Sequence, residues 1–530
     1  RCIHCTDFKK NGVMQNPHLF FEVPSVKKTV LALMIITLLS KFLGFARELV
    51  LAYFYGASAV SDAYLISITI PTVIFAFIGA GIATSYIPLY TEITAQKGIG
   101  EADRFSNNLI NFLIIFCTFV ILLGLIFTEP VVKLFASGFK GDTLRLAVYF
   151  TRISILGIYF MALAYVCTGY LQIKNNFIIP ALIGFPYNFF IIASIFLSSG
   201  GSYIFLPWGL VLAIASQFFL LLPFAFKNGY RYRLLIDRKD PYLRRVIYLA
   251  LPVILGSSIS QINTLVDRTL ASGIAVGGIS ALNYASRLNG FVQGIFVLTV
   301  ATVIYPAISR MAADNNIEGL KKSIAQAVNT VNLMLVPVTV GAMLLTEPIV
   351  RLLFGRGAFD IRAVEMTAYA LFFYAVGMTG FGLREILARA FYSLQDTKTP
   401  MINAAVGFTM NIILNLVLSR YLGIGGLALA TSISAIFTTG LLMLNLRKKI
   451  GALGGKNILL TFIKISTASA VMGAAVFGIY NVLPIYMDEN LALLVSIASG
   501  AVVYFGIVSF MKIEEVNVIL KAARARMAHM

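Results

Sequence analysis

The chain has 530 residues, of which 59% are hydrophobic and only 12% are charged. This composition excludes an ordinary soluble protein and predicts an all-α polytopic membrane protein, because a helix satisfies its own backbone polar groups inside lipid. The formal net charge of +19 falls in the predicted loops, so it indicates membrane topology and contact with anionic membrane lipids rather than binding of nucleic acid.

The first 24 residues differ from the rest of the chain. They are polar, begin with Arg1, and lack the charged and apolar regions of a signal peptide, so we expect a disordered N-terminal extension. Cys2 and Cys5 form a lone CxxC, and Cys117 and Cys167 lie in apolar segments. This pattern predicts neither a metal site nor a disulfide framework.

Fourteen hydrophobic segments follow, and we expect each to be a transmembrane helix. Their approximate spans are 26–55, 61–95, 104–128, 143–173, 177–199, 205–226, 242–272, 279–311, 318–346, 362–394, 399–420, 425–447, 457–483 and 490–511.

An internal repeat divides these segments. The sequence TEPVVKL, beginning at Thr128, recurs as TEPIVRL, beginning at Thr346, and Pro88 recurs as Pro306 at the same offset of 218 residues. Two six-helix lobes, 25–228 and 229–450, are therefore predicted, and an even number of crossings places their pseudo-twofold axis along the membrane normal. Two appended helices at 451–512 could form a groove for a lipid tail or serve only as a scaffold, and a basic tail occupies 513–530.

The basic residues predict the orientation of the chain. The loop after the sixth segment carries five arginines and two lysines between Lys227 and Arg245, and the loop after the twelfth and the C-terminal tail are also basic. Because cytoplasmic loops are enriched in lysine and arginine, both termini are expected to be cytoplasmic.

Charged residues within the apolar segments mark a candidate site. Lys41, Arg47 and Glu48 lie in the first segment and Asp62 starts the second, although a charge near the centre of a membrane helix costs about 2.5–3.5 kcal/mol. Ser40 shares a helix face with Arg47. The alternative to a polar cavity is a structural pair between Lys41 and Glu48.

The second predicted lobe contributes further charges, Asp267 and Arg268 in the seventh segment and Arg287 in the eighth. The predicted substrate-binding set is Ser40, Lys41, Arg47, Glu48, Asp62, Arg268 and Arg287. Because arginine binds phosphate oxygens through a planar fork of donors, this mostly basic set favours an anionic headgroup over a cationic drug.

Polar residues in the second lobe suggest an ion site. Asn411 and Asn415 lie four residues apart, Thr431 lies in the next segment, and Asp267 could add one carboxylate. Such a set suits Na⁺ as a coupling ion, and the alternative is hydrogen bonding between helices. No other metal site and no cofactor is expected.

The motifs resemble those of a known family. SKFLGFARELVLAYFYGASAVSDAYLIS at 40–67, LPVILGSSISQIN at 251–263, LFGRGAFD at 353–360 and FYSLQDTKTP at 391–400 are similar to the MurJ (MviN) lipid II flippases of the MOP superfamily. The resemblance covers about residues 26–515 and implies a 6+6+2 arrangement of helices.

The resemblance also implies roles for single residues. Arg47 matches the family's essential arginine, Asp62 its aspartate after the first helix, and Arg287 its cavity arginine. Lys41 stands where many members have arginine. The sequence departs from the family at Phe75 and Ala76, where some members have two arginines, and Arg268 could replace that charge.

The implied function is transport, not catalysis. The family moves the undecaprenyl-diphosphate-linked peptidoglycan precursor, lipid II, from the cytoplasmic to the outer leaflet of the bacterial inner membrane for cell wall synthesis and cell shape. We expect a monomer that works by alternating access, driven by the membrane potential or an ion gradient, because the chain lacks the GxxxxGK[ST] motif of ATP-driven proteins.

The sequence is also compatible with two other functions. The first is a flippase for another prenyl-linked oligosaccharide or a MATE-like cation-coupled exporter. The second is a membrane-embedded glycosyltransferase, against which stand the three histidines, His4, His18 and His529, all in the tails.

Overall fold

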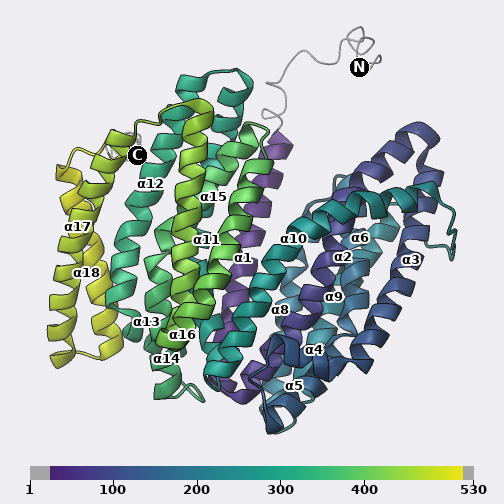
Figure 1. The fold of residues 1–530 in the computed structure, drawn as a ribbon, viewed down its shortest axis with the longest axis horizontal. Coiled ribbons are helices and arrows are strands. Elements are labelled where there is room, and N and C mark those ends of the chain that lie inside the picture. The colour runs from purple at the N-terminus through teal and green to yellow at the C-terminus, as the bar shows by residue number, and fades with distance from the viewer. Residues whose placement is uncertain (1–23, 517–530) are drawn as a thin grey trace.

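The computed structural model describes residues 24–516 and is helical, with no strand among those residues. Residues 1–23 of the predicted extension and residues 517–530 of the basic tail therefore lie outside the described residues. Figure 1 shows α11 to α18 on one side of the molecule and α2 to α9 on the other, with α1 and α10 where the two sides meet. The elements are α1 (Pro24–Tyr55), α2 (Ala59–Lys97), α3 (Ile99–Ile126), α4 (Thr128–Phe135), α5 (Gly141–Ser154), α6 (Gly157–Ile173), α7 (Ile178–Leu182), α8 (Gly184–Ser198), α9 (Phe205–Lys227), α10 (Pro241–Ile274), α11 (Gly278–Ala313), α12 (Ile317–Leu344), α13 (Thr346–Phe354), α14 (Ile361–Val376), α15 (Met378–Ser393), α16 (Lys398–Ile450), α17 (Gly455–Val482), a 3₁₀ turn (Leu483–Ile485) and α18 (Glu489–Phe510).

Many of these helices are long and apolar enough to cross a bilayer. Within the described residues nine helices meet this criterion, and three bent pairs raise the number to as many as 12. Two of the bent pairs are α5 with α6, at 41°, and α14 with α15, at 46°. The third bend, of 50°, lies within α10 near Gly256. The chain is therefore a multi-pass membrane protein, as its composition predicts.

The longest helix, α16, is a hairpin. Gly423 has φ 54° and ψ −130°, a backbone conformation that favours glycine, and the helix reverses there. A contact between its two arms shows the reversal, because Asn445 donates a hydrogen bond to Asn403 at 3.0 Å. The Lys449 ammonium also lies 2.6 Å from the carboxylate of Asp396, which just precedes the helix. The arms match the predicted segments 399–420 and 425–447.

The repeated TEP sequences form equivalent short helices. The residues that cap α4 and α13, Phe127 and Leu345, have nearly the same backbone angles, φ −101° and −112° with ψ 24° in both. Val132 and Val350, 218 residues apart, are each fully buried. The repeated sequence thus folds into a repeated local structure.

The appended helices α17 and α18 pack against α12. Leu333 and Val336 of α12 share a buried cluster with Met472 of α17 and Tyr504 of α18, and the Tyr504 hydroxyl donates to the Leu333 carbonyl at 2.8 Å. This pair lies at the outer edge of one side of the molecule (Figure 1), away from the place where the two sides meet.

Candidate substrate cavity

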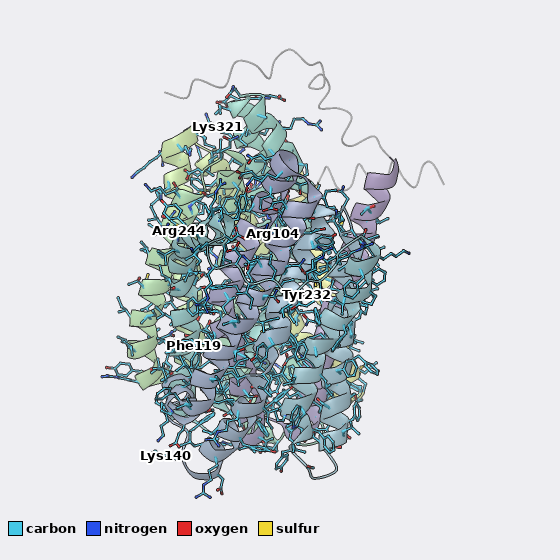
Figure 2. The ribbon with its side chains drawn as sticks, turned by 90° about the vertical axis from the view of Figure 1, so that its right-hand side faces the viewer. Arg104, Phe119, Lys140, Tyr232, Arg244 and Lys321 are labelled. Carbon is cyan, nitrogen blue, oxygen red and sulfur yellow. The ribbon has the colours of Figure 1, made fainter. Side chains whose placement is uncertain are left out.

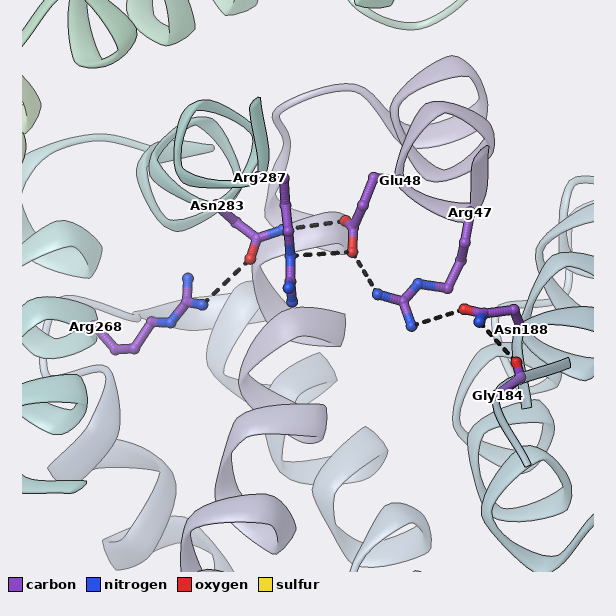
Figure 3. Close-up of polar contacts among 7 residues, drawn as sticks. All are labelled: Arg47, Glu48, Gly184, Asn188, Arg268, Asn283 and Arg287. Carbon is purple, nitrogen blue, oxygen red and sulfur yellow. Dashed lines mark hydrogen bonds and ion pairs between the residues drawn. The ribbon is translucent and has the colours of Figure 1, made fainter. Parts of the chain in front are cut away.

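Glu48 is the centre of a charged network between α1 and α11 (Figure 3). Its side chain is 2% exposed. The carboxylate accepts from Arg47 Nη2 at 2.6 Å and from Asn283 Nδ2 at 3.1 Å, and lies 3.5 Å from Arg287 Nε. Because a buried carboxylate needs charged or hydrogen-bonding partners, α1 and α11 are held together through this one side chain. Glu48 thus pairs with Arg47 and Arg287, rather than with Lys41.

Arg47 also contacts α8. Its Nη1 donates to Asn188 Oδ1 at 3.3 Å, and its guanidinium carbon lies 5.7 Å from the centre of the Tyr187 ring. Asn188 is fixed in turn by donating to the Gly184 carbonyl at 2.8 Å. These contacts place the Arg47 fork between a carboxylate and an amide oxygen, in one orientation.

Arg268 joins the network from α10. It donates to the Ile279 carbonyl at 3.2 Å and to Asn283 Oδ1 at 3.4 Å. Because Asn283 also donates to Glu48, its amide links Arg268 to the carboxylate. Sequence reasoning missed Asn188 and Asn283, and the available signal was an amide side chain inside each apolar segment.

Two cavities adjoin this network. One of about 410 Å³ is lined by Lys41 and Arg47 of α1, by Arg287 of α11, and by aromatic side chains including Phe42 and Phe291. The other, of about 330 Å³, is lined by Arg47, Glu48, Arg268, Asn283 and Arg287 together with Tyr64 and Tyr187. Four cationic side chains and one carboxylate therefore face these two cavities, which suits an anionic ligand.

Ser40 does not line either cavity. A Cβ atom added at Gly184 would lie only 2.1 Å from the Ser40 hydroxyl, so Ser40 packs against the start of α8. Gly44 also faces α8, near Asn188. On the predicted face of Ser40 and Arg47, Ser40 is therefore a packing residue, whereas Gly44 and Arg47 line the larger of the two cavities.

Asp62 does not line these cavities either, and instead binds the N-terminus of α11. Its carboxylate accepts from the Gly277 and Ser280 backbone amides, each at 2.8 Å, and from the Ser280 hydroxyl at 2.6 Å. The Tyr284 hydroxyl adds a bond to the Gly56 carbonyl at 3.2 Å. Asp62 is 1% exposed, so this buried contact joins the starts of α2 and α11.

The structure brings the four residues of the predicted ion set together. Asn415 donates from Nδ2 to Asp267 Oδ1 and, at 2.8 Å, to Asn411 Oδ1, while Asn411 donates to Thr431 Oγ1 at 3.2 Å. The Asn415 Oδ1 atom is buried and has no hydrogen-bond partner. The set thus contains one carboxylate and one unpartnered amide oxygen. Between residues 24 and 516 no three His, Cys, Asp or Glu side chains are grouped as a metal site.

Comparison with known proteins identifies the family. The sequence model of the family described as "Lipid II flippase MurJ" matches residues 51–495. A probable lipid II flippase MurJ of Vibrio cholerae is 31% identical over 438 residues, covering 80% of this chain and 83% of the relative. One from Thermotoga maritima is 29% identical and covers 94% and 99% of the two chains.

Solved structures agree with the sequence comparison. A lipid II flippase MurJ in an inward closed conformation has a TM-score of 0.79 and 29% identity, over 90% of this chain and 98% of that one. A multidrug resistance MATE family transporter of the MOP superfamily, at 15% identity and a TM-score of 0.66, shares the fold. The chain belongs to the MurJ lipid II flippase family.

Proposed function

We propose that this protein is the transporter that moves lipid II, the undecaprenyl-diphosphate-linked muropeptide, across the bacterial inner membrane. The observation that carries the proposal is the network of Arg47, Arg268 and Arg287 around the buried Glu48 beside two cavities. Arginine forks match the oxygens of a diphosphate, and the network keeps these forks in place before the headgroup arrives. Membership of a transporter family supports transport over the glycosyltransferase reading.

The proposed architecture has fourteen spans. The nine apolar helices and three bent pairs account for twelve, the second arm of α16 adds one, and α1 adds another. These form lobes at 25–228 and 229–450, with α17 and α18 as an appended pair. The matching α4 and α13 helices support a pseudo-twofold relation between the lobes.

The proposed mechanism is alternating access from the cytoplasmic side. The larger cavity is lined by α1 from Leu38 to Arg47, the part nearer the chain's N-terminus, while the opposite end is closed by Asp62 and Ser280. With both termini in the cytoplasm, this arrangement faces inward. The headgroup enters beside Lys41 and Arg47, the prenyl tail stays in lipid, and rearrangement of the lobes separates Asp62 from Ser280.

Sodium is the proposed coupling ion. Asp267, Asn411, Asn415 and Thr431 would hold it, and the bound ion would supply the free energy of its gradient. The site adjoins the network, because Arg268 follows Asp267 in α10 and binds Asn283. A sodium ion bound near Asp267 would therefore act on α10, the helix that positions Arg268 at the cavity.

Rescue of bacteria depleted of their own lipid II flippase tests the function. Expression of this protein is expected to restore growth and cell shape, and failure to do so at normal membrane levels would contradict the proposal. The specific alternatives, another prenyl-linked oligosaccharide or a MATE-like cation, predict no rescue. Accessibility of lipid II at the outer surface of the rescued cells measures the transport step directly.

A further inference from the structure

The loop between α9 and α10 is fixed against α3 by three asparagines. Asn107, Asn108 and Asn111 are each at most 3% exposed. Asn107 donates to the Arg231 carbonyl at 3.0 Å and accepts from the Arg233 amide at 3.2 Å. Donor and acceptor bonds from one amide side chain to one stretch of backbone resemble the pairing of a β-strand.

The other two asparagines continue this pairing along the loop. Asn108 donates to the Asp237 carbonyl at 2.9 Å and accepts from the Asp237 amide at 2.8 Å. Asn111 donates to the Leu235 carbonyl at 2.9 Å and accepts from the Tyr232 hydroxyl at 2.5 Å. The loop is therefore held in one conformation, and the positions of its arginines are set by α3.

The fixed loop forms a basic pocket. Arg104 of α3 lines a cavity of about 440 Å³ together with Arg231 and Arg233 of the loop. Among residues 24–516 the guanidinium groups of Arg231 and Arg233 have no hydrogen-bond or ion-pair partner. Arg104 makes two long ion pairs within the described part of the chain, 3.7 Å to Asp237 and 3.9 Å to Glu101. The Asp103 carboxylate, which also lines the pocket, accepts from the Tyr90 hydroxyl at 2.7 Å.

The pocket lies near the N-terminal end of α3. Below Arg104 the α3 sequence becomes apolar, and Phe119 is 59% exposed on the same face (Figure 2). Figure 2 shows Arg104 and Tyr232 above Phe119, with Lys140 at the opposite end. Next to the arginines, Leu234 is 79% exposed and Ile236 is 53% exposed. Paired basic and apolar side chains at this level match the boundary between lipid phosphates and acyl chains.

We propose that Arg104, Arg231 and Arg233 bind the phosphate of an anionic phospholipid at the edge of α3. Leu234 and Ile236 contact its acyl chains, which distinguishes a lipid from a free phosphate. This site lies outside the proposed cargo cavity, so its occupant is a membrane lipid that stays in its leaflet. The three asparagines act as positioning residues for the arginines.

Native mass spectrometry of the detergent-purified full-length protein tests this site. With added phosphatidylglycerol, the wild type is expected to retain a lipid that Arg231→Ala/Arg233→Ala binds at least about tenfold more weakly, because each cation near an anionic surface contributes substantially to binding. Phosphatidylcholine is expected to bind more weakly to the wild type. Both arginines are exposed, so the variant's melting temperature should stay within a few degrees of the wild type's.

The matched control removes two exposed cations elsewhere, at the end of α16. Arg447→Ala/Lys448→Ala changes the net charge equally and is expected to bind phosphatidylglycerol within about twofold of the wild type. Equal losses in the two variants would show a diffuse charge effect and overturn the site. Displacement of the lipid by millimolar inorganic phosphate would overturn the role of the acyl chains. Because the readout is binding, it stays informative even if the protein fails to rescue flippase-depleted cells.

Discussion

The Asp62 carboxylate accepts hydrogen bonds from both the backbone amide and the hydroxyl of Ser280, a residue 218 positions later in the chain. That separation equals the offset of the TEP repeat, so equivalent positions of the two predicted lobes meet each other. Opening of this end during transport would require the contact between the starts of α2 and α11 to break.

Asp62→Asn should open this end. The substitution replaces one acceptor oxygen by a donor group, so an amide of Gly277 or Ser280 loses its acceptor in a buried place, at a cost of about 1–3 kcal/mol. In a cysteine-free background, we expect an impermeant maleimide to label Ala57→Cys severalfold faster when Asp62→Asn is present. Asp488→Asn, the same change at the N-cap of α18, is the control, and equal labelling in both would contradict the role of Asp62.

Arg47→Ala should abolish rescue of flippase-depleted cells. It removes bonds to Glu48 and Asn188 and leaves a carboxylate short of one cation, so binding of a diphosphate headgroup should weaken roughly 30-fold or more. Arg47→Lys keeps the charge but not the fork and should rescue partially. Arg145→Ala, at an exposed position in α5, should rescue fully. Full rescue by Arg47→Ala at normal expression would refute the cavity assignment.

Sodium should stabilise the wild-type protein through Asp267. At a concentration ten times its dissociation constant, an ion that binds only the folded state adds about 1.4 kcal/mol to the free energy of unfolding. The melting temperature should therefore be higher in NaCl than in KCl of equal ionic strength. Asp267→Asn should remove the difference, whereas Asp314→Asn, at an exposed position, should keep it. A wild type that melts identically in both salts would argue against the ion site.

The salt bridge at the open end of the α16 hairpin should be lost in acid. The bond from Lys449 and the amide of Thr399 lower the pKa of Asp396 from its ordinary 3.8 to about 2. A pKa that is lower in the folded state stabilises the fold above the unfolded value and ceases to do so as the pH falls through the folded value. Asp396→Asn should therefore melt earlier than the wild type at pH 7, and the difference should shrink below about pH 4 and be lost only below about pH 2. A difference that is as large at pH 2 as at pH 7 would exclude this ionic origin.

The sequence was sufficient for the membrane class and for most of the cavity charges. Lys41, Arg47, Glu48, Arg268 and Arg287 stood out because charge within an apolar helix is costly, and all five line the two cavities. The contact between Asn411 and Asn415 was similarly predictable, because the two residues share one helix face.

Other features depended on how helices meet. Asn188 and Asn283 are neutral amides in apolar segments. The local sequence does not distinguish an amide that holds an arginine from one that forms a hydrogen bond between two helices. Helical spacing placed Lys41 on the same face as Glu48, yet the flexible arm of Arg47 reaches its own neighbour. In the sequence Asp62 resembled a cavity residue, because its contact with the N-terminus of α11 is visible only in the folded structure.

Glu48 has a kinetic consequence for the proposed cargo. Its carboxylate already occupies one donor of Arg47 and lies against Arg287, so an arriving diphosphate competes with an anion that belongs to the protein. The arginines are consequently neutralised in part by a carboxylate of the protein itself. A transporter that binds its substrate too tightly releases it slowly. Competition from the Glu48 carboxylate therefore shortens the time for which the headgroup stays bound and favours turnover.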